Sequence, residues 1–329
     1  MHNTRQDATS DLTRLTAPRP LREQLAADVR RGLTGPERSL PPIYLYDAAG
    51  SDLFEQITDL DEYYPTRTER GILEEHAGDL VRAIRPVELL ELGSGSSVKT
   101  DLLLTALRDA GGDRYVALDI SEAALAPAID RLRRTHPWLV ADGYTADFHH
   151  DLPAIERSGR RLVTFLGSTI GNLDPSNREV LLQQIAAVLE PDDGVLLGID
   201  LVKDPGVLVP AYDDAAGVTA AFNRNVLHVI NRELDGDIPV DAFAHRAVWN
   251  AEAERIEMHL VANRSVDAHL AAIELDLTFG RDDHIVTEHS HKFRIEGFVD
   301  ELAAVGLSVD QVVTDDRGWF AEVLATPQA

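Results

Sequence analysis

The chain has 329 residues, 44% of them hydrophobic and 26% charged, which is enough for a large core and for two domains. Its formal net charge of -25 would repel phosphates and anionic membrane surfaces, so we expect neither nucleic acid nor a membrane as a partner. The chain contains no cysteine, which excludes disulfides, thiolate metal ligands and cysteine nucleophiles and leaves catalysis to oxygen and nitrogen groups.

The N-terminal part of the chain is expected to be helical after a polar start. The segment MHNTRQDATS lacks the apolar core of a signal peptide, and no later segment approaches the length of a membrane span, so we expect a cytoplasmic protein. Capping residues and apolar spacing predict helices over 21–33, over 51–60 with Ser51 as the N-cap, and over 68–84.

Five short apolar runs then alternate with helical patterns. They are VELLELG, YVALDI, LVADGYTAD, RLVTFLG and GVLLGID, and they end at residue 200. Apolar strands separated by helices are typical of βαβ units with a parallel sheet covered on both faces. The sequence therefore predicts a doubly wound, Rossmann-like α/β unit over about residues 69–202.

The pattern changes after this unit. A helix is expected over 215–234, followed by three alternating segments, RIEMHLVANR, LAAIELDLTF and HIVTEHSHKF, which predict an inserted antiparallel sheet. A helix over 296–306 and strands in LSVDQVVTD and WFAEVLA would return to the first sheet. This layout is typical of class I methyltransferases. We assign residues 68–202 and 293–329 to a cofactor-binding domain, and residues 15–67 and 203–292 to a second, α+β, substrate-binding domain.

The turn after the first predicted strand resembles a cofactor loop. In ELGSGSSVKTDLLL, Gly93 and Gly95 would allow the backbone to approach a ligand at the start of a helix. A dinucleotide fingerprint requires a third glycine where Val98 stands. Asp119 ends the second strand and could accept hydrogen bonds from two ribose hydroxyls. Together with Glu91, this is the pattern of S-adenosylmethionine sites; Asp147 and Phe148, after the third strand, could contact adenine.

The segment VTEHSHKF offers two faces if it is extended. Glu288, Ser290 and Lys292 would point one way, and Thr287, His289 and His291 the other. The histidine face could bind a metal only with help from His284 or from the pair His149 and His150. Since alternating histidines on an exposed strand face are commonly solvated, we predict no metal site and expect the Glu288 face to carry the function.

Five motifs in order resemble the L-histidine Nα-methyltransferase family of ergothioneine biosynthesis. They are YDAAGSDLFEQITDLDEYYPTRTER, ELGSGSSVKT, FLGSTIGNLDP, AYDDAAGVTAAFNRNVL and TEHSHKF, and the resemblance extends from about Leu21 to the last strand. It implies that S-adenosylmethionine is used to trimethylate the α-amine of histidine, which gives the betaine hercynine.

The resemblance also implies roles for individual residues. The cofactor would be bound by Tyr46, Gly93, Lys99, Asp119, Asp147 and Phe148. The substrate carboxylate would be held by Asn172 and Tyr212 beside Gly167, and the imidazole would meet Tyr63, Met258, Glu288 and Ser290. Tyr46, Asn172 and Tyr212 are the expected catalytic residues, and Tyr63 is preferred to its neighbour Tyr64 on the motif alone.

Chemistry gives these roles a rationale. Methyl transfer to an amine is an in-line displacement that needs alignment and a water-poor pocket but no protein nucleophile. The Asn172 amide and the Tyr212 hydroxyl would donate to the carboxylate without adding another fixed cation. Glu288 and Ser290 would select imidazole by hydrogen bonds, and Tyr46 could relay the proton that the amine loses.

Three alternatives remain open from the sequence. The acceptor could be another amino acid or small amine, the protein could be a catalytically silent cofactor-binding regulator, or it could be a metal-dependent oxygenase. A monomer is expected, because no segment forms an exposed apolar stripe.

Overall fold

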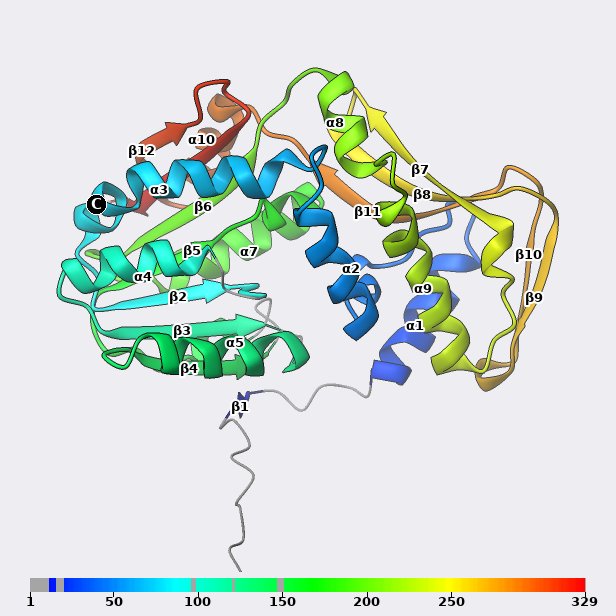
Figure 1. Ribbon diagram of the computed structural model, residues 1–329, viewed down its shortest axis with the longest axis horizontal. Helices are drawn as coiled ribbons and strands as arrows, with labels where there is room; N and C mark the ends of the chain where they lie inside the picture. The colour runs from blue at the N-terminus through cyan, green and yellow to red at the C-terminus, as the bar shows by residue number, and fades with distance from the viewer. Residues whose placement is uncertain (1–11, 16–20, 96–98, 120–121, 147–150, 329) are drawn as a thin grey trace, which may run out of the picture.

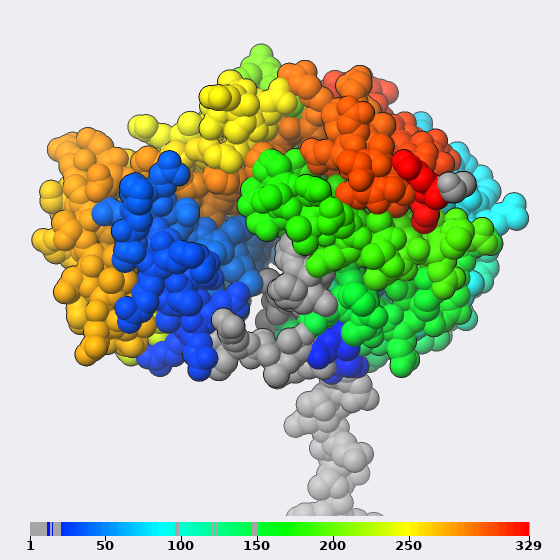
Figure 2. All heavy atoms as spheres, turned by 180° about the vertical axis from the view of Figure 1, so that it is seen from behind, coloured from blue at the N-terminus to red at the C-terminus, as the bar shows by residue number. Residues whose placement is uncertain are grey.

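A computed structural model describes residues 12–15, 21–95, 99–119, 122–146 and 151–328. A twisted sheet with helices on both faces forms one side of the molecule, and a second group of helices and strands forms the other (Figure 1). Seen from behind, the surface is hollowed between the blue N-terminal part and the green part of the chain (Figure 2).

The large sheet has the strand order β1-β4-β3-β2-β5-β6-β13-β12. The strands up to β6 are parallel, whereas β13 runs antiparallel to both of its neighbours. Their bounds are β1 Thr13–Arg14, β2 Glu88–Leu92, β3 Arg114–Asp119, β4 Val140–Thr145, β5 Arg161–Phe165, β6 Gly194–Asp200, β12 Leu307–Thr314 and β13 Phe320–Pro327. All five predicted strands and both returning strands are confirmed; β1 was not predicted.

Helices cover both faces because the central strands are apolar on both. Successive residues of β5 alternate between two cores: Leu162 packs with α3 (Tyr64–Ile84), α4 (Thr100–Asp109) and α5 (Glu122–Thr135), and Val163 packs with α7 (Pro175–Val188) and α10 (Ile295–Ala304). β2 lies between β3 and β5. From this point the chain continues to β3 and β4 on one side of the sheet and to β5 and β6 on the other, so the strand order reverses here. The carboxyl ends of these strands therefore form the crevice where doubly wound folds bind ligands.

The second group of elements has its own core. It contains α1 (Leu21–Leu33), α2 (Ala48–Thr58), α8 (Pro205–Tyr212) and α9 (Val218–Leu234), with a three-stranded sheet of order β11-β8-β7 and a hairpin of β9 and β10. The strands are β7 Phe243–Asn250, β8 Arg255–Ala262, β9 Val266–Leu270, β10 Leu275–Phe279 and β11 His284–His291. The predicted boundary at residue 67 falls within α3, so the division into domains stays a prediction.

Several expectations for this group were wrong in detail. The three alternating segments do not form one sheet, because β8 pairs with β11 while β10 pairs with β9. Strands β7 and β9 and helix α8 were missed. The N-cap of α2 is Asp47 rather than Ser51: the Asp47 carboxylate accepts a hydrogen bond from the Gly50 amide at 2.9 Å, and Ser51 lies inside the helix.

A β-bulge in β11 changes the predicted faces. Val286 is opposite His259 and Glu288 is opposite Met258, so Thr287 has no partner in the ladder. The Thr287 hydroxyl is buried and donates to the Met258 carbonyl at 3.0 Å. Glu288 and Ser290 do lie on one face and His289 and His291 on the other, but Thr287 is not part of the histidine face. The bulge brings Glu288 to the same face as Ile285.

Candidate active site

The glycine loop lies at the carboxyl end of β2. Gly93 and Gly95 have φ angles of +62° and +49°, in the left-handed region that favours glycine. A Cβ on Gly95 would meet no atom of the described residues within 4 Å, and the Gly95 amide donates to the Asp119 carboxylate at 3.0 Å. An acid at the end of β3 thus lies against a loop whose glycines adopt positive φ, which fits a ribose-bearing cofactor such as S-adenosylmethionine. Asp147 and Phe148 lie outside the described residues.

Lys99 is held by a buried acid from α3. Its ammonium forms an ion pair with Glu69, which also accepts a hydrogen bond from the amide of Gly167. Gly167 has a φ of +75°, and a Cβ there would lie 3.4 Å from Lys99 Nζ. Glu69 therefore links two sequence-predicted residues, Lys99 at the N-cap of α4 and Gly167 just after β5.

A second buried acid, Glu322 of β13, lies behind Glu69. Among the described residues, no group donates a hydrogen bond to either of its carboxyl oxygens. Burial, followed by the negative charge of Glu69, raises the pKa of Glu322 well above its ordinary value. Gly198 makes room for both acids, because a Cβ there would lie 2.4 Å from Glu69 Oε1.

Glu91 was counted in the cofactor pattern but has structural contacts. Its carboxylate accepts hydrogen bonds from the Thr100 hydroxyl, at 2.7 Å, and from the Tyr115 hydroxyl. Burial raises the pKa of Glu91 to about 7. It therefore fastens the start of α4 to β2 and β3.

Aromatic rings form a connected wall from the cofactor side to the inserted sheet. Tyr46 is edge-on to Phe54 at 5.5 Å, Phe54 is edge-on to Tyr63 at 6.2 Å, and Tyr63 is edge-on to Tyr212 at 6.1 Å. Burial of the Tyr46 hydroxyl, followed by the charge of Glu288, raises the pKa of Tyr46 well above its ordinary value, although part of the residue is exposed. The hydroxyl therefore keeps its proton, so it can donate or relay but does not act as an ionised base.

Glu288 and Met258 lie side by side on the inserted sheet. They are direct cross-strand partners and both are buried. Among the described residues, Oε2 of Glu288 has no hydrogen-bond partner. Burial raises the pKa of Glu288 to about 7, and the positive charge of Lys292 opposes this rise. A buried acid without a partner is costly, which indicates that a ligand supplies one.

Ser290, two residues along the strand, contacts Tyr212 from α8. Their oxygens are 2.8 Å apart, and Lys292 Nζ donates to both at 2.8 Å. Lys292 also forms an ion pair with Asp200, the last residue of β6, at 2.9 Å. The expected carboxylate clamp is therefore not free of a fixed cation, because a fully buried ammonium lies directly behind Tyr212.

Sequence reasoning missed Lys292 and Asp200, although signals were present. Lys292 shares the strand face already assigned to Glu288 and Ser290, and Asp200 ends a parallel strand as Asp119 does. The Lys292 and Lys203 charges lower the pKa of Asp200 against the effect of burial, so this acid is ionised. Lys203 also donates to the Tyr64 hydroxyl at 2.8 Å, and burial lowers the pKa of Lys203 to about 8.

The adjacent tyrosines have different surroundings. Tyr63 faces Tyr212 and Phe54, whereas the Tyr64 hydroxyl donates to Asp200 at 2.7 Å and its ring is edge-on to Trp319 at 5.1 Å. Tyr63 is thus the one beside the other predicted substrate residues.

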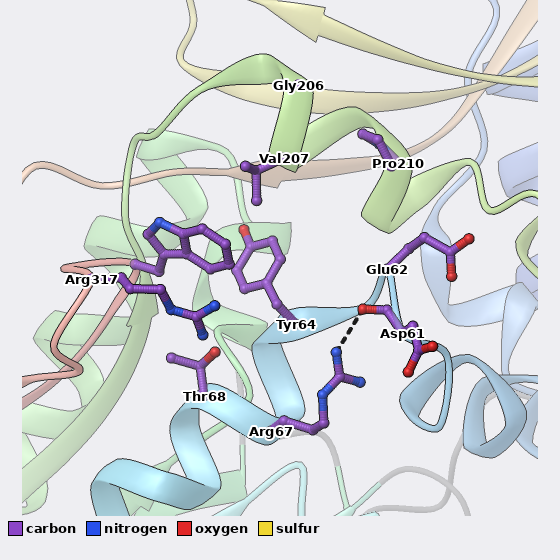
Figure 3. Close-up of a pocket in the computed structure, with 10 residues that line it drawn as sticks. Asp61, Glu62, Tyr64, Arg67, Thr68, Gly206, Val207, Pro210 and Arg317 are labelled. Carbon is purple, nitrogen blue, oxygen red and sulfur yellow. Dashed lines mark hydrogen bonds between the residues drawn. The ribbon is translucent and has the colours of Figure 1, made fainter.

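Tyr64 also lines a separate pocket of about 390 Å³ between α3, α8 and the turn before β13 (Figure 3). In this pocket Arg67 donates to the backbone oxygen of Asp61 at 2.7 Å, and Arg317 stacks over Trp319. None of the residues predicted to bind substrate or cofactor lines it.

The turn that carries Asn172 is fixed by His291. Its Nδ1 lies 2.9 Å from the carbonyl oxygen of Gly171, and His291 is buried. A Cβ on Gly171 would lie 2.7 Å from the His291 carbonyl oxygen, so this close approach requires glycine. The expectation of a solvated His291 was wrong, since it attaches the Asn172 turn to β11.

Metal ligands are not grouped in the described part of the chain. No set of three or more histidine, cysteine, aspartate or glutamate residues there could hold an ion. His284 stacks on His259 at 4.5 Å and His289 is half-buried, whereas His149 and His150 lie outside the described residues. Likewise, none of the described helices combines the length and apolarity needed to cross a membrane.

Comparison with known proteins identifies the family. A family model described as a histidine-specific, SAM-dependent methyltransferase matches residues 25–327. The chain is 50% identical to the histidine N-alpha-methyltransferase of Mycolicibacterium smegmatis, over 92% of this chain and 95% of that protein. It is 47% identical to the enzyme of the same name from Mycobacterium tuberculosis, over 92% and 94%. A 4-dimethylallyltryptophan N-methyltransferase from Claviceps fusiformis is 26% identical over 91% of this chain and 89% of its own. The chain belongs to the family of S-adenosylmethionine-dependent, histidine-specific methyltransferases.

Proposed function

We propose that this protein transfers methyl groups from S-adenosylmethionine to the α-amine of L-histidine, up to the trimethylated betaine hercynine, as the first step of ergothioneine biosynthesis. The observation that carries the proposal is Glu288, a buried carboxyl whose Oε2 has no partner among the described residues. An imidazole N–H would supply that partner.

The two ends of histidine would be held by different parts of the chain. Asn172 and Tyr212, beside Gly167, would bind the carboxylate, and Tyr63, Met258, Glu288 and Ser290 would surround the ring. Burial raises the pKa of Tyr212, so its hydroxyl keeps the proton that it would donate to the carboxylate. Holding both ends fixes the direction of the α-amine between them.

Glu288 would provide selectivity for the side chain. A charge-assisted hydrogen bond contributes about 1.5–3 kcal/mol, which corresponds to roughly one or two orders of magnitude in affinity per bond. An amino acid without a ring N–H would leave the buried acid unpaired, which adds to the discrimination.

The cofactor would lie on the glycine loop. Gly93, Gly95, Asp119 and Lys99 would bind it, with Tyr46 between it and the amine, and Asp147 and Phe148 are proposed to contact its adenine. When bound, S-adenosylmethionine supplies an electrophilic methyl group on a positively charged sulfur. The residues of this chain align the amine, exclude water through the wall of Tyr46, Phe54 and Tyr63, and leave a hydroxyl at Tyr46 through which a proton can move.

A second acceptor class is kept because of one relative. The Claviceps fusiformis protein is named for a substituted tryptophan, so proteins similar over most of this chain can bear names with other acceptors. An indole has one ring N–H, whereas the pair Glu288 and Ser290 offers two polar partners, which favours imidazole.

The test is incubation of the purified protein with S-adenosylmethionine and an equimolar mixture of the twenty amino acids, with products read by mass. Histidine alone should gain one, two and three methyl groups. Methylation of a different amino acid would support the proposed cofactor but overturn histidine as the acceptor.

We also propose that the protein is a monomer. Light scattering of the same sample would test this.

A further inference from the structure

The hydroxyls of Tyr212 and Ser290 can be assigned donor and acceptor roles from the group behind them. Lys292 Nζ lies 2.8 Å from each oxygen and 2.9 Å from Asp200 Oδ2, so its three N–H groups have three partners. A lysine ammonium has donors but no lone pair. Each hydroxyl therefore accepts from Lys292, and neither can donate to it.

The remaining protons can then be counted. The two oxygens are 2.8 Å apart, so one of the two hydroxyl protons lies between them. Each oxygen has two lone pairs, one of which already accepts from Lys292. The hydroxyl that accepts across the pair keeps its own proton for a ligand, and the hydroxyl that donates across the pair keeps one lone pair for a ligand.

The proposed substrate decides which is which. A carboxylate accepts hydrogen bonds and donates none, so Tyr212 must point its proton at the substrate carboxylate. Ser290 then donates to Tyr212 and can only accept from the ring. One ring nitrogen must therefore carry a hydrogen directed at Ser290.

The other ring nitrogen faces Glu288. Either that nitrogen is also protonated and donates to an ionised Glu288, or it is bare and accepts from a protonated Glu288. In both arrangements the pair formed by the ring and Glu288 holds one more proton than a neutral imidazole beside an ionised carboxylate.

We propose that Lys292 is a positioning residue that makes Ser290 an acceptor, so that histidine binds with one additional proton shared between its ring and Glu288. The inference rests on the proposed function, because it assumes that Tyr212 binds the substrate carboxylate. It extends that function by stating the protonation state in which the substrate is recognised.

The charges around Glu288 suit this state. Lys292 is the cation that acts on it, and it is already paired with Asp200. Three tyrosines lie near it: Tyr46 directly after η1 (Pro42–Leu45), Tyr63 directly before α3, and Tyr212 at the end of α8. Burial raises the pKa of each, so they stay neutral. None of these groups donates a hydrogen bond to Oε2 of Glu288, so a ring proton would supply the missing donor.

The test measures proton uptake. Histidine is titrated calorimetrically into the full-length protein with S-adenosylhomocysteine present to prevent turnover, at pH 8.5, in buffers of different ionisation enthalpy. The wild type should take up about one proton more than Glu288→Gln, because a glutamine amide can donate to or accept from a neutral ring. Taking the difference in proton uptake between wild type and Glu288→Gln cancels any proton that the α-amine gains or loses on binding. The affinity ratio of wild type to Glu288→Gln should fall about tenfold per pH unit above pH 8.

Two further variants separate positioning from folding. Ser290→Ala removes the acceptor for the second ring hydrogen, and Lys292→Met removes the donor that fixes the hydroxyl pair, so both should lose the additional proton uptake. Lys292→Met leaves Asp200 with one partner fewer. If this variant does not fold, Ser290→Ala alone provides the test.

The outcomes distinguish this inference from the proposed function. Equal proton uptake by wild type and Glu288→Gln, with histidine bound by both, overturns the inference and leaves the function intact. Unchanged uptake in a folded Ser290→Ala variant also overturns it. If the wild type neither binds nor methylates histidine, the proposed function itself fails. If Glu288→Gln does not bind histidine, the comparison is made within the wild type. Proton uptake on histidine binding that is no larger at pH 8.5 than at pH 5.5 then overturns the inference.

Discussion

Glu288 and Met258 are direct partners on neighbouring antiparallel strands, immediately after the bulge in β11. A buried carboxyl and a thioether therefore project side by side from the inserted sheet. This pairing joins a polar contact for a ring nitrogen to an apolar contact for a ring face, and it locates the proposed selectivity on the second group of elements rather than on the cofactor-binding sheet.

Glu288→Gln should reduce kcat/KM for histidine by about 10- to 100-fold, because it removes one charge-assisted hydrogen bond. Initial rates at varied histidine concentration measure this change. Glu257→Gln is the matched control, since Glu257 is on the opposite face of β8 and is bound by Arg255 and His259. Equal losses in the two variants would contradict a role for Glu288 in recognition.

Gly95→Ala should raise KM for S-adenosylmethionine and cost about 1–2 kcal/mol of stability, because alanine disfavours a left-handed backbone. Gly111→Ala provides the control: Gly111 has a φ of +90°, and a Cβ there would also lie more than 4 Å from every described atom outside its own neighbours. Thermal unfolding should show similar losses for both, and only Gly95→Ala should weaken cofactor binding. Weakened binding in both variants would argue against the glycine loop as the site.

Tyr46→Phe should lower kcat by about 100-fold and alter the dependence of rate on pH, since it removes the hydroxyl proposed to relay the amine proton. Tyr44→Phe is a suitable control. The Tyr44 hydroxyl is also buried, but it donates to Asp28 at 2.5 Å and takes no part in the proposed site. A Tyr46→Phe variant with an unchanged pH profile would count against the relay.

Glu322→Gln should become more stable relative to wild type as pH rises. The folded protein keeps the Glu322 proton that the unfolded chain loses above about pH 4.5, since the folded pKa is raised. Wild-type stability therefore falls through the interval between these two pKa values, by at most about 1.4 kcal/mol per pH unit. Unfolding at pH 5 and pH 8 measures this trend, with Glu252→Gln on the exposed surface as the control. Parallel curves for wild type and Glu322→Gln would show that Glu322 is ionised in the folded protein.

The parallel sheet could be predicted because its strands are continuous apolar runs, and the helices between them have clear periodicity. Helix α8 was missed because PGVLVPAY contains two prolines and a glycine, which are typical of a loop. Strands β7 and β9 were missed because His and Arg interrupt the apolar residues of FAHRAVWN, and VDAHL is only five residues long.

The candidate site likewise has some features that short stretches of sequence predict and others that depend on contacts between distant segments. The glycine loop and the alternation of Glu288 with His289 are visible within a few residues of sequence. The contact of Lys292 with Asp200 and Tyr212 joins segments that are far apart in the chain, and no local pattern specifies it. The burial of His291 against Gly171 likewise depends on how two elements pack.

The bulge at Thr287 also has a consequence for how acceptor choice could change. If the strand alternated strictly with Ile285 in the core, Glu288 and Ser290 would point to the opposite face from Met258. The extra residue, Thr287, shifts the alternation by one position and returns them to the face of Met258. The strand thus has an anchoring half before the bulge and, after it, the half that carries the proposed recognition residues. Residues 288–290 could therefore be replaced together, by design or by natural variation, while the anchoring half and the glycine loop keep their packing.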